Sequence, residues 1–247
     1  VLSISYSNLL TSLKVSSRRC LLLKYLKIWD CRNLKVLKLS APKLETFEYF
    51  GPQLSGGKVV LFAPSLVELF LGGPMSGSPW RQVLPTIDKL RTLKLGFAVY
   101  SYGFSGLFFE WENTGVTHLE ISLETFSSGT ADLLTTILLP FLGLQRLTLK
   151  WCASRCFVKT EIRTRRYSLS RKLKVVEFIG FNGFECEIQL LLQLHEYYPM
   201  LERIVINPCV PYAIGTMEET TARLSNRYKQ AKRTGIGTEG HPTFVGF

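Results

Sequence analysis

Residues 23–50 read LKYLKIWDCRNLKVLKLSAPKLETFEYF, and this stretch decides the fold. Apolar residues recur in it at positions i, i+3 and i+5, first at Leu23, Leu26 and Ile28. The last two residues of each triplet are two apart, so they share one face of a short strand. The same spacing returns along the chain, with first positions at residues 23, 34, 44, 66, 90, 116, 144, 173 and 201.

The spacing is typical of leucine-rich repeats, in which one repeat takes about 20 to 29 residues. The intervals between the first positions are 11, 10, 22, 24, 26, 28, 29 and 28 residues. Since the two short intervals cannot each close a coil, we place residues 34–39 on the outer side of the coil that runs from Leu23 to Leu44. The predicted fold class is α/β, a right-handed leucine-rich-repeat solenoid of about seven or eight repeats with inner parallel strands and outer loops or helices.

Outer helices are expected late in the chain, where the intervals are longest. Helical spacing followed by a proline predicts helices over 131–139 and 185–197, and a short helix is expected within 79–89. A capping-box pattern at Thr216 and Glu219 opens a basic helix that runs to Arg233.

The expected domains follow from these elements. Residues 1–170 form the leucine-rich repeats, residues 171–235 form a terminal segment continuous with the solenoid, and residues 236–247 form a flexible tail. An uncapped first coil exposes apolar surface, so we expect residues 1–22 to be poorly ordered or the isolated chain to aggregate.

Composition sets the class of protein. With 46% hydrophobic and 20% charged residues, the chain is typical of globular proteins rather than disordered ones. Its longest apolar run, residues 133–144, is shorter than the roughly 20 residues of a membrane helix, so no membrane span is expected. The net charge of +11 is compatible with nucleic acid, membrane surfaces and acidic proteins alike. Six cysteines are too few for a disulfide scaffold, which favours reduced thiols and a nuclear or cytoplasmic protein.

No catalytic constellation is recognisable. The segment GPQLSGGK (51–58) lacks the spacing of a phosphate-binding loop. The histidines lie far apart and outside any metal or nucleophile motif, at positions 118, 195 and 241. We therefore expect a protein that is not an enzyme, without cofactor or metal. Three cysteines just after strand triplets are expected to be core thiols, namely Cys31, Cys152 and Cys209.

The functional surface is expected on the strand positions that alternate away from the core and line the concave face. Exposed aromatic side chains flanked by polar groups are typical of protein-binding hot spots. An alternative is that these rings pack on neighbouring strands or lie under a further N-terminal domain. The candidate partner-binding residues are Tyr25, Trp29, Phe50, Phe70, Lys94, His118, Arg146 and Arg203.

Most of the positive excess lies in residues 150–174 and in the helix expected after Thr216. A basic outer loop is most often a solvated connection, and the alternatives are an acidic partner, a nuclear localisation signal or a phosphate ligand. Nucleic acid is not an expected partner, because few aromatic residues interleave with these charges. A further hypothesis places a phosphorylated small molecule on Arg146, Lys150 and Arg203.

Three blocks carry a family resemblance: LKLSAPKLETFEYFG (37–51), APSLVELFLGG (63–73) and LKVVEFIGFNGFECEIQLLLQLHEYYPMLERIVINPC (173–209). They resemble plant F-box/LRR proteins, specifically the leucine-rich region and the C-terminal FBD-type segment. The last block follows the family's order of a strand, a Gly-Phe-x-Gly turn, an acidic helix and a Leu-Glu-x-Ile-x-Ile strand. The tract 159–171 matches no motif of the family, and no F-box is found in the sequence.

The resemblance implies a substrate-recognition subunit of an SCF-type ubiquitin ligase. In that scheme the repeats hold the target protein on the concave face, and a Skp1-like adaptor binds only through an F-box upstream of this region. Ligase chemistry would lie on other subunits. The alternative is a leucine-rich-repeat scaffold without an F-box, which binds a protein without promoting its ubiquitination.

Overall fold

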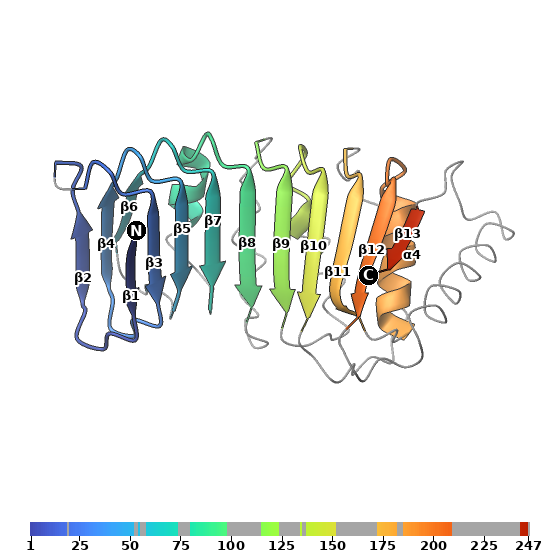
Figure 1. Cartoon of the computed structure of the whole chain (residues 1–247), viewed down its shortest axis with the longest axis horizontal. Coiled ribbons are helices and arrows are strands. Elements are labelled where there is room, and N and C mark those ends of the chain that lie inside the picture. The colour runs from blue at the N-terminus through green and yellow to red at the C-terminus, as the bar shows by residue number, and fades with distance from the viewer. Residues whose placement is uncertain are drawn as a thin grey trace, which may run out of the picture. The chain divides into compact units, whose positions relative to one another are not determined.

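The computed structural model describes residues 1–18, 20–51, 54, 58–73, 80–97, 115–123, 134, 137–151, 172–181, 185–208 and 243–246. Within these residues the chain is mostly parallel β-sheet in solenoid-like stacks with few helices (Figure 1). It divides into two compact units, Val1–Leu119 and Glu120–Phe247. The domain boundaries expected near residues 170 and 235 differ from this division and stay a prediction.

In the first unit, one strand from each coil joins a parallel sheet that we call sheet A. Tyr25 pairs with Thr46, which pairs with Glu68, in steps of 21 and 22 residues. The strands follow the order β1 (Leu2–Ser5), β3 (Tyr25–Trp29), β5 (Thr46–Phe50), β7 (Glu68–Gly72) and β8 (Thr92–Phe97). β9 (His118–Leu123) begins in this unit and crosses the boundary to the second.

A second parallel sheet, sheet B, is formed by β2 (Ser12–Val15), β4 (Val36–Ser40) and β6 (Lys58–Phe62) in that order. Each early coil therefore supplies one strand to each sheet. The placement of residues 34–39 as an extended outer segment is confirmed, because β4 pairs with β2 and β6 and not with sheet A. Leu37 and Leu39 are buried in the core of the unit.

The core follows from strand alternation. On β3 and β5 the inward residues are buried while their neighbours are half-buried, as the triplet spacing predicts. Beyond β7 the outer connection is the short helix α1 (Trp80–Val83), followed by the 3-10 turn η1 (Leu84–Thr86). Trp80 is buried, with its ring centroid 6.0 Å from that of Phe47 and 5.3 Å from that of Tyr49. Helix α1 confirms the short helix expected within 79–89.

The second unit has parallel strands β10 (Arg146–Trp151), β11 (Val175–Phe181), β12 (Arg203–Pro208) and β13 (Thr243–Gly246). Helix α4 (Glu185–Tyr197) joins β11 to β12, which confirms the helix expected over 185–197. It buries Ile188, Leu191 and Leu194 on one side. Of the helix expected over 131–139, the described residues Leu134, Ile137 and Leu138 are helical and buried.

Both ends of the chain differ from expectation. Residues 1–22, expected to be poorly ordered, contribute β1 to sheet A and β2 to sheet B, because their backbone pairs with that of the second coil. Within the expected flexible tail, residues Thr243–Gly246 pair with β12.

Several predicted features lie outside the described residues. They include the basic helix from Thr216 to Arg233, Cys152, Cys209, His241 and residues 152–171 of the basic tract. The identity of the coils as leucine-rich repeats stays a prediction.

Candidate functional site

The outward side chains of sheet A form columns, because its strands pair without a shift. One column contains Trp29, Phe50, Gly72 and Gly96, and the next contains Lys27, Glu48, Phe70 and Lys94. The candidate residues of the first unit lie half-buried at outward positions of β3, β5, β7, β8 and β9, and they are Tyr25, Trp29, Phe50, Phe70, Lys94 and His118.

Three of these residues come together in what we call the aromatic cluster: Trp29, Phe50 and Phe70. The ring centroid of Trp29 is 4.7 Å from that of Phe50 and 5.7 Å from that of Phe70. The interplanar angles are 18° and 12°, so both pairs are stacked. Each stacked pair contributes about 0.5–1.5 kcal/mol beyond the area it buries. The rings are therefore held in place while part of their surface still meets solvent.

Two glycines make room for the cluster. A Cβ atom on Gly72 would lie 2.5 Å from Cδ2 of Phe50 and 2.9 Å from Cζ of Phe70, and one on Gly96 would lie 3.1 Å from the same Cζ. The phenyl rings therefore occupy the space that side chains at these positions would fill. Gly72 and Gly96 are not among the candidate residues predicted from the sequence, although their column shared with Trp29 and Phe50 was a signal that could have found them.

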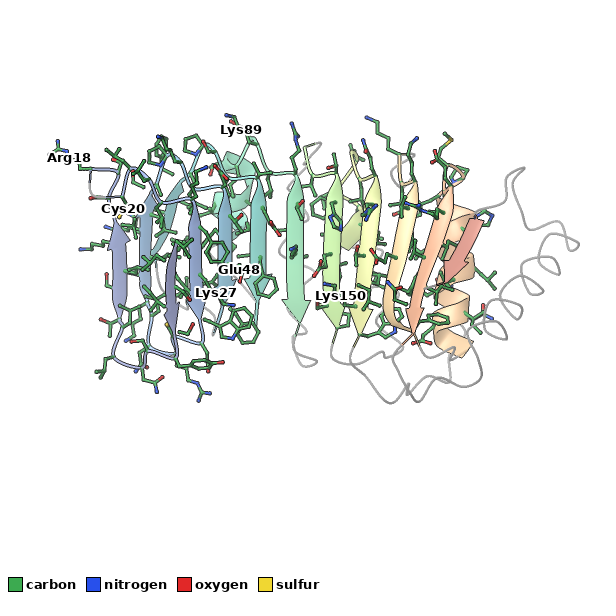
Figure 2. The ribbon with its side chains drawn as sticks, viewed as in Figure 1. Arg18, Cys20, Lys27, Glu48, Lys89 and Lys150 are labelled. Atoms are coloured by element: carbon green, nitrogen blue, oxygen red, sulfur yellow. The ribbon has the colours of Figure 1, made fainter. Side chains whose placement is uncertain are left out.

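Charged side chains lie next to the aromatic cluster on the outward face of sheet A. Nζ of Lys27 lies 4.3 Å from the centroid of the Trp29 ring, in a cation–π contact, and 3.4 Å from a carboxylate oxygen of Glu48. Lys94 forms an ion pair with Glu68. Figure 2 labels Lys27 and Glu48 on the neighbouring strands β3 and β5. These lysines are thus matched by carboxylates on adjacent strands.

Tyr25 belongs to the same surface. Burial raises the pKa of its hydroxyl, and a hydrogen bond with Glu48 raises this pKa further, as do the negative charges of Glu48 and Glu68. Tyr25 therefore stays neutral at physiological pH. It offers a polar group on the same outward face as the aromatic cluster, at the other end of β3.

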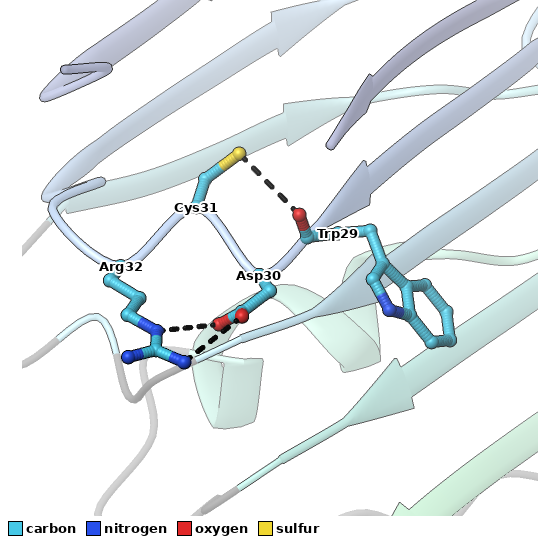
Figure 3. Close-up of polar contacts among 4 residues, drawn as sticks. All are labelled: Trp29, Asp30, Cys31 and Arg32. Atoms are coloured by element: carbon cyan, nitrogen blue, oxygen red, sulfur yellow. Dashed lines mark hydrogen bonds and ion pairs between the residues drawn. The ribbon is translucent and has the colours of Figure 1, made fainter. Parts of the chain in front are cut away.

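The turn after β3 fixes the backbone beneath Trp29 (Figure 3). Asp30 has a positive φ of 49°, and its N–H donates to the carbonyl of Phe50 at 2.6 Å. Nε and Nη2 of Arg32 donate to the two carboxylate oxygens of Asp30 at 3.2 and 3.3 Å. Sγ of Cys31 lies 3.8 Å from the carbonyl oxygen of Trp29. Cys31 is a buried free thiol, which confirms the core position predicted for it.

The second unit places two residues of the phosphate hypothesis on non-adjacent strands, and the hypothesis itself stays a prediction. Arg146 and Arg203 are not neighbours, because Val175 of β11 lies between them in the register. Adjacent strands are about 4.8 Å apart, so the two arginines are separated by about twice that distance. Nζ of Lys150 lies 2.7 Å from Oε1 of Glu120, which compensates its charge.

The outward face of this unit holds a polar group that the sequence analysis missed. Nδ2 of Asn207 donates to Oε1 of Glu177 at 3.0 Å, and the hydroxyl of Thr148 donates to Oε2 at 3.5 Å. These contacts cross β10, β11 and β12. They hold Glu177 in place by hydrogen bonds.

His118 lies on β9, and His195 is buried on α4. Across the described ranges, no group of three or more His, Cys, Asp or Glu residues is placed to hold a metal ion. Nor is any helix in that part of the chain long and apolar enough to cross a membrane.

No protein-family model matches this chain, and a search of curated proteins finds no significant match. The resemblance to plant F-box/LRR proteins therefore stays a prediction from the sequence.

Proposed function

We propose that this chain is a protein-binding module and that its partner docks on the aromatic cluster. The observation that carries the proposal is the stacking of Trp29 on Phe50 and Phe70 at an outward, half-buried face of sheet A. Rigid aromatic side chains supply large contact area and little conformational entropy is lost when they bind, which is why they dominate binding hot spots. The rings of the cluster are already held in place in the unbound protein, so binding a partner requires little further ordering of these side chains.

The charges around the cluster favour a polypeptide partner over a phosphorylated ligand. Lys27 and Lys94 both face carboxylates of adjacent strands. A phosphate would have to displace Glu48 or Glu68 to reach them. A polypeptide can instead place apolar side chains on the rings and hydrogen-bond to the charged rim, as protein interfaces commonly do.

The resemblance extends the proposal to the recognition part of an F-box subunit in an SCF-type ubiquitin ligase, acting in the nucleus or cytoplasm. Its partner would then be the protein destined for ubiquitination. The alternative remains a scaffold without a ligase role. The upstream transcript separates the two: an F-box in frame, together with co-purification of the translated protein with a Skp1-like adaptor, favours the ligase subunit, and a start codon without an F-box favours the scaffold.

The test of the binding site uses short random peptides displayed on phage and selected on the intact protein. The affinity of selected peptides is measured for the native protein, Trp29→Ala and Phe70→Ala. Removal of a hot-spot residue costs about 2 kcal/mol or more, so we expect the affinity to fall about 30-fold.

Phe62→Ala is the matched control, because Phe62 is an exposed aromatic residue of sheet B. It should leave the affinity within about twofold, and circular dichroism should show that every variant is folded. Equal affinity of the native protein and Trp29→Ala for all selected peptides would contradict the proposed site.

A further inference from the structure

The outward face of sheet B is basic and apolar. Strand alternation turns Lys14 and Lys38 to solvent on β2 and β4, and it turns Lys58, Val60 and Phe62 to solvent on β6. Val60 is 42% exposed and Phe62 is 58% exposed, although both are large apolar residues. We call these five residues the cationic face. No Asp or Glu occurs in the three strands.

The lysines of this face differ from those of sheet A. Lys27 of β3 pairs with Glu48 and Lys94 of β8 pairs with Glu68, and Lys24, just before β3, pairs with Glu45, each across adjacent coils. Lys14, Lys38 and Lys58 form no ion pair or hydrogen bond with any other residue in the part of the chain that the structure describes. The fold thus neutralises positive charge on one sheet and leaves it uncompensated on the other.

The register of sheet B also places two of these positive charges side by side. Lys14 of β2 lies directly opposite Lys38 of β4, and Lys38 lies opposite Val60 of β6. Paired residues of neighbouring strands have backbones about 4.8 Å apart, and like charges in such positions repel each other. A negative group placed over Lys14 and Lys38 would remove this repulsion.

We propose that the cationic face binds an acidic, partly apolar segment of another protein, separately from the aromatic cluster. The carboxylates of that segment lie over Lys14, Lys38 and Lys58, and its apolar side chains cover Val60 and Phe62. Charge complementarity identifies the occupant, because the face carries three uncompensated cations and no anion.

The exposed apolar residues favour an acidic protein segment over nucleic acid. A phosphate backbone would bind the lysines and leave Val60 and Phe62 unused, because sugar and phosphate are polar. A protein segment that alternates acidic and apolar side chains uses both kinds of group. Opposite charges also raise the rate at which such a partner associates.

The test measures binding of a fluorescent peptide in which Glu alternates with Val or Phe to the full chain, by fluorescence anisotropy. Two comparison peptides replace the apolar residues by Ser or the Glu residues by Lys. We expect the acidic, apolar peptide to bind at least about tenfold more tightly than either. Lys14→Glu/Lys38→Glu should weaken this binding at least about tenfold, and Phe62→Ser should weaken it severalfold.

The matched control is Lys43→Glu/Lys89→Glu. It changes the net charge by the same amount at exposed lysines in turns outside sheet B; Lys89 is labelled in Figure 2. This control should bind within about twofold of the native protein. Thermal unfolding establishes that all variants are folded.

Three outcomes would overturn the proposal: no binding of the acidic, apolar peptide, equal loss in both double variants, or preference for a DNA oligonucleotide or phosphatidylserine vesicles over the peptide. Trp29→Ala should leave this peptide's affinity unchanged, so failure here is distinguishable from failure of the aromatic cluster as a binding site.

Discussion

Gly72 shows how a residue without a side chain shapes the surface above it. Its Cα hydrogen points into the space where the rings of Phe50 and Phe70 converge. Gly73, the next residue, has a φ of 97°, and a Cβ there would clash with the carbonyl oxygen of Gly51. The two glycines therefore serve different needs: Gly72 provides space for the rings, and Gly73 provides the turn.

Gly72→Ala should displace the aromatic cluster. Its Cβ would lie closer to ring atoms than real Cβ atoms do, so we expect a loss of about 1–3 kcal/mol in the free energy of unfolding and weaker binding of the selected peptides. Gly96→Ala is the graded control, since its nearest contact of 3.1 Å requires only a small shift of Phe70. Urea denaturation measures both variants, and equal losses would contradict the steric account.

At the scale of elements, β4 has the same apolar spacing as the strands of sheet A but belongs to sheet B. Its spacing alone would have placed it beside β3. The intervals of 11 and 10 residues on either side exclude that placement, because they are too short for a complete coil. Repeat length therefore predicted the outer position of β4. Its partner β2 carries the same spacing at Leu10, Leu13 and Val15, whereas the segment of β6 contains no complete triplet.

The inward and outward sides of sheet B should respond very differently to truncation. Leu37 of β4 is fully buried, so Leu37→Ala should lower the free energy of unfolding by about 2–5 kcal/mol. Val60 of β6 is 42% exposed, so Val60→Ala should change it by about 0.5 kcal/mol or less. Urea denaturation of both variants is the measurement. A small effect at Leu37 would contradict the two-sheet core.

Tyr198, at the end of α4, provides a test by pH. Its side chain is buried, its hydroxyl has no hydrogen-bond partner among the described residues, and burial raises its pKa above the ordinary value of 10.0. Above pH 10 the unfolded chain ionises this hydroxyl while the folded chain does not, so ionisation stabilises the unfolded state and the free energy of unfolding falls as pH rises.

Tyr198→Phe removes both the unsatisfied hydroxyl and its ionisation. We expect the variant to be more stable at neutral pH by about 1 kcal/mol, and to lose less stability than the native protein between about pH 9 and 11. Thermal unfolding across this range measures both effects. Parallel losses in the two proteins would show that Tyr198 does not titrate as proposed.

At the scale of the whole molecule, the sequence predicted a solenoid with parallel strands and the columns of its outward face. Leu26, Phe47 and Leu69 face the core as their spacing requires, and Trp29 and Phe50 share a column. The stacking of Phe70 on Trp29 was not predictable, because Phe70 lies in a different column and reaches Trp29 only by leaning over Gly72. Side-chain direction within a column depends on the neighbours, which spacing does not specify.

Which lysines form ion pairs could also not be predicted from the sequence. Lys27 and Lys14 are both outward lysines of early strands, yet Lys27 meets Glu48 while Lys14 meets Lys38. The difference arises from which strand lies alongside, a property of sheet register over more than 20 residues. The two sheets of the first unit thus present different surfaces, an aromatic one with compensated charge and a cationic one.

The central claim is that a partner docks on the aromatic cluster, and site-specific photo-cross-linking tests it most directly. Ser5 of β1 pairs with Trp29 in the register and is exposed, whereas Ser12 of β2 is exposed on sheet B. Ser5→benzoylphenylalanine should cross-link to a peptide selected on the native protein, and Ser12→benzoylphenylalanine should not. Cross-linking from position 12, or from neither position while the peptide still binds, would contradict the claim.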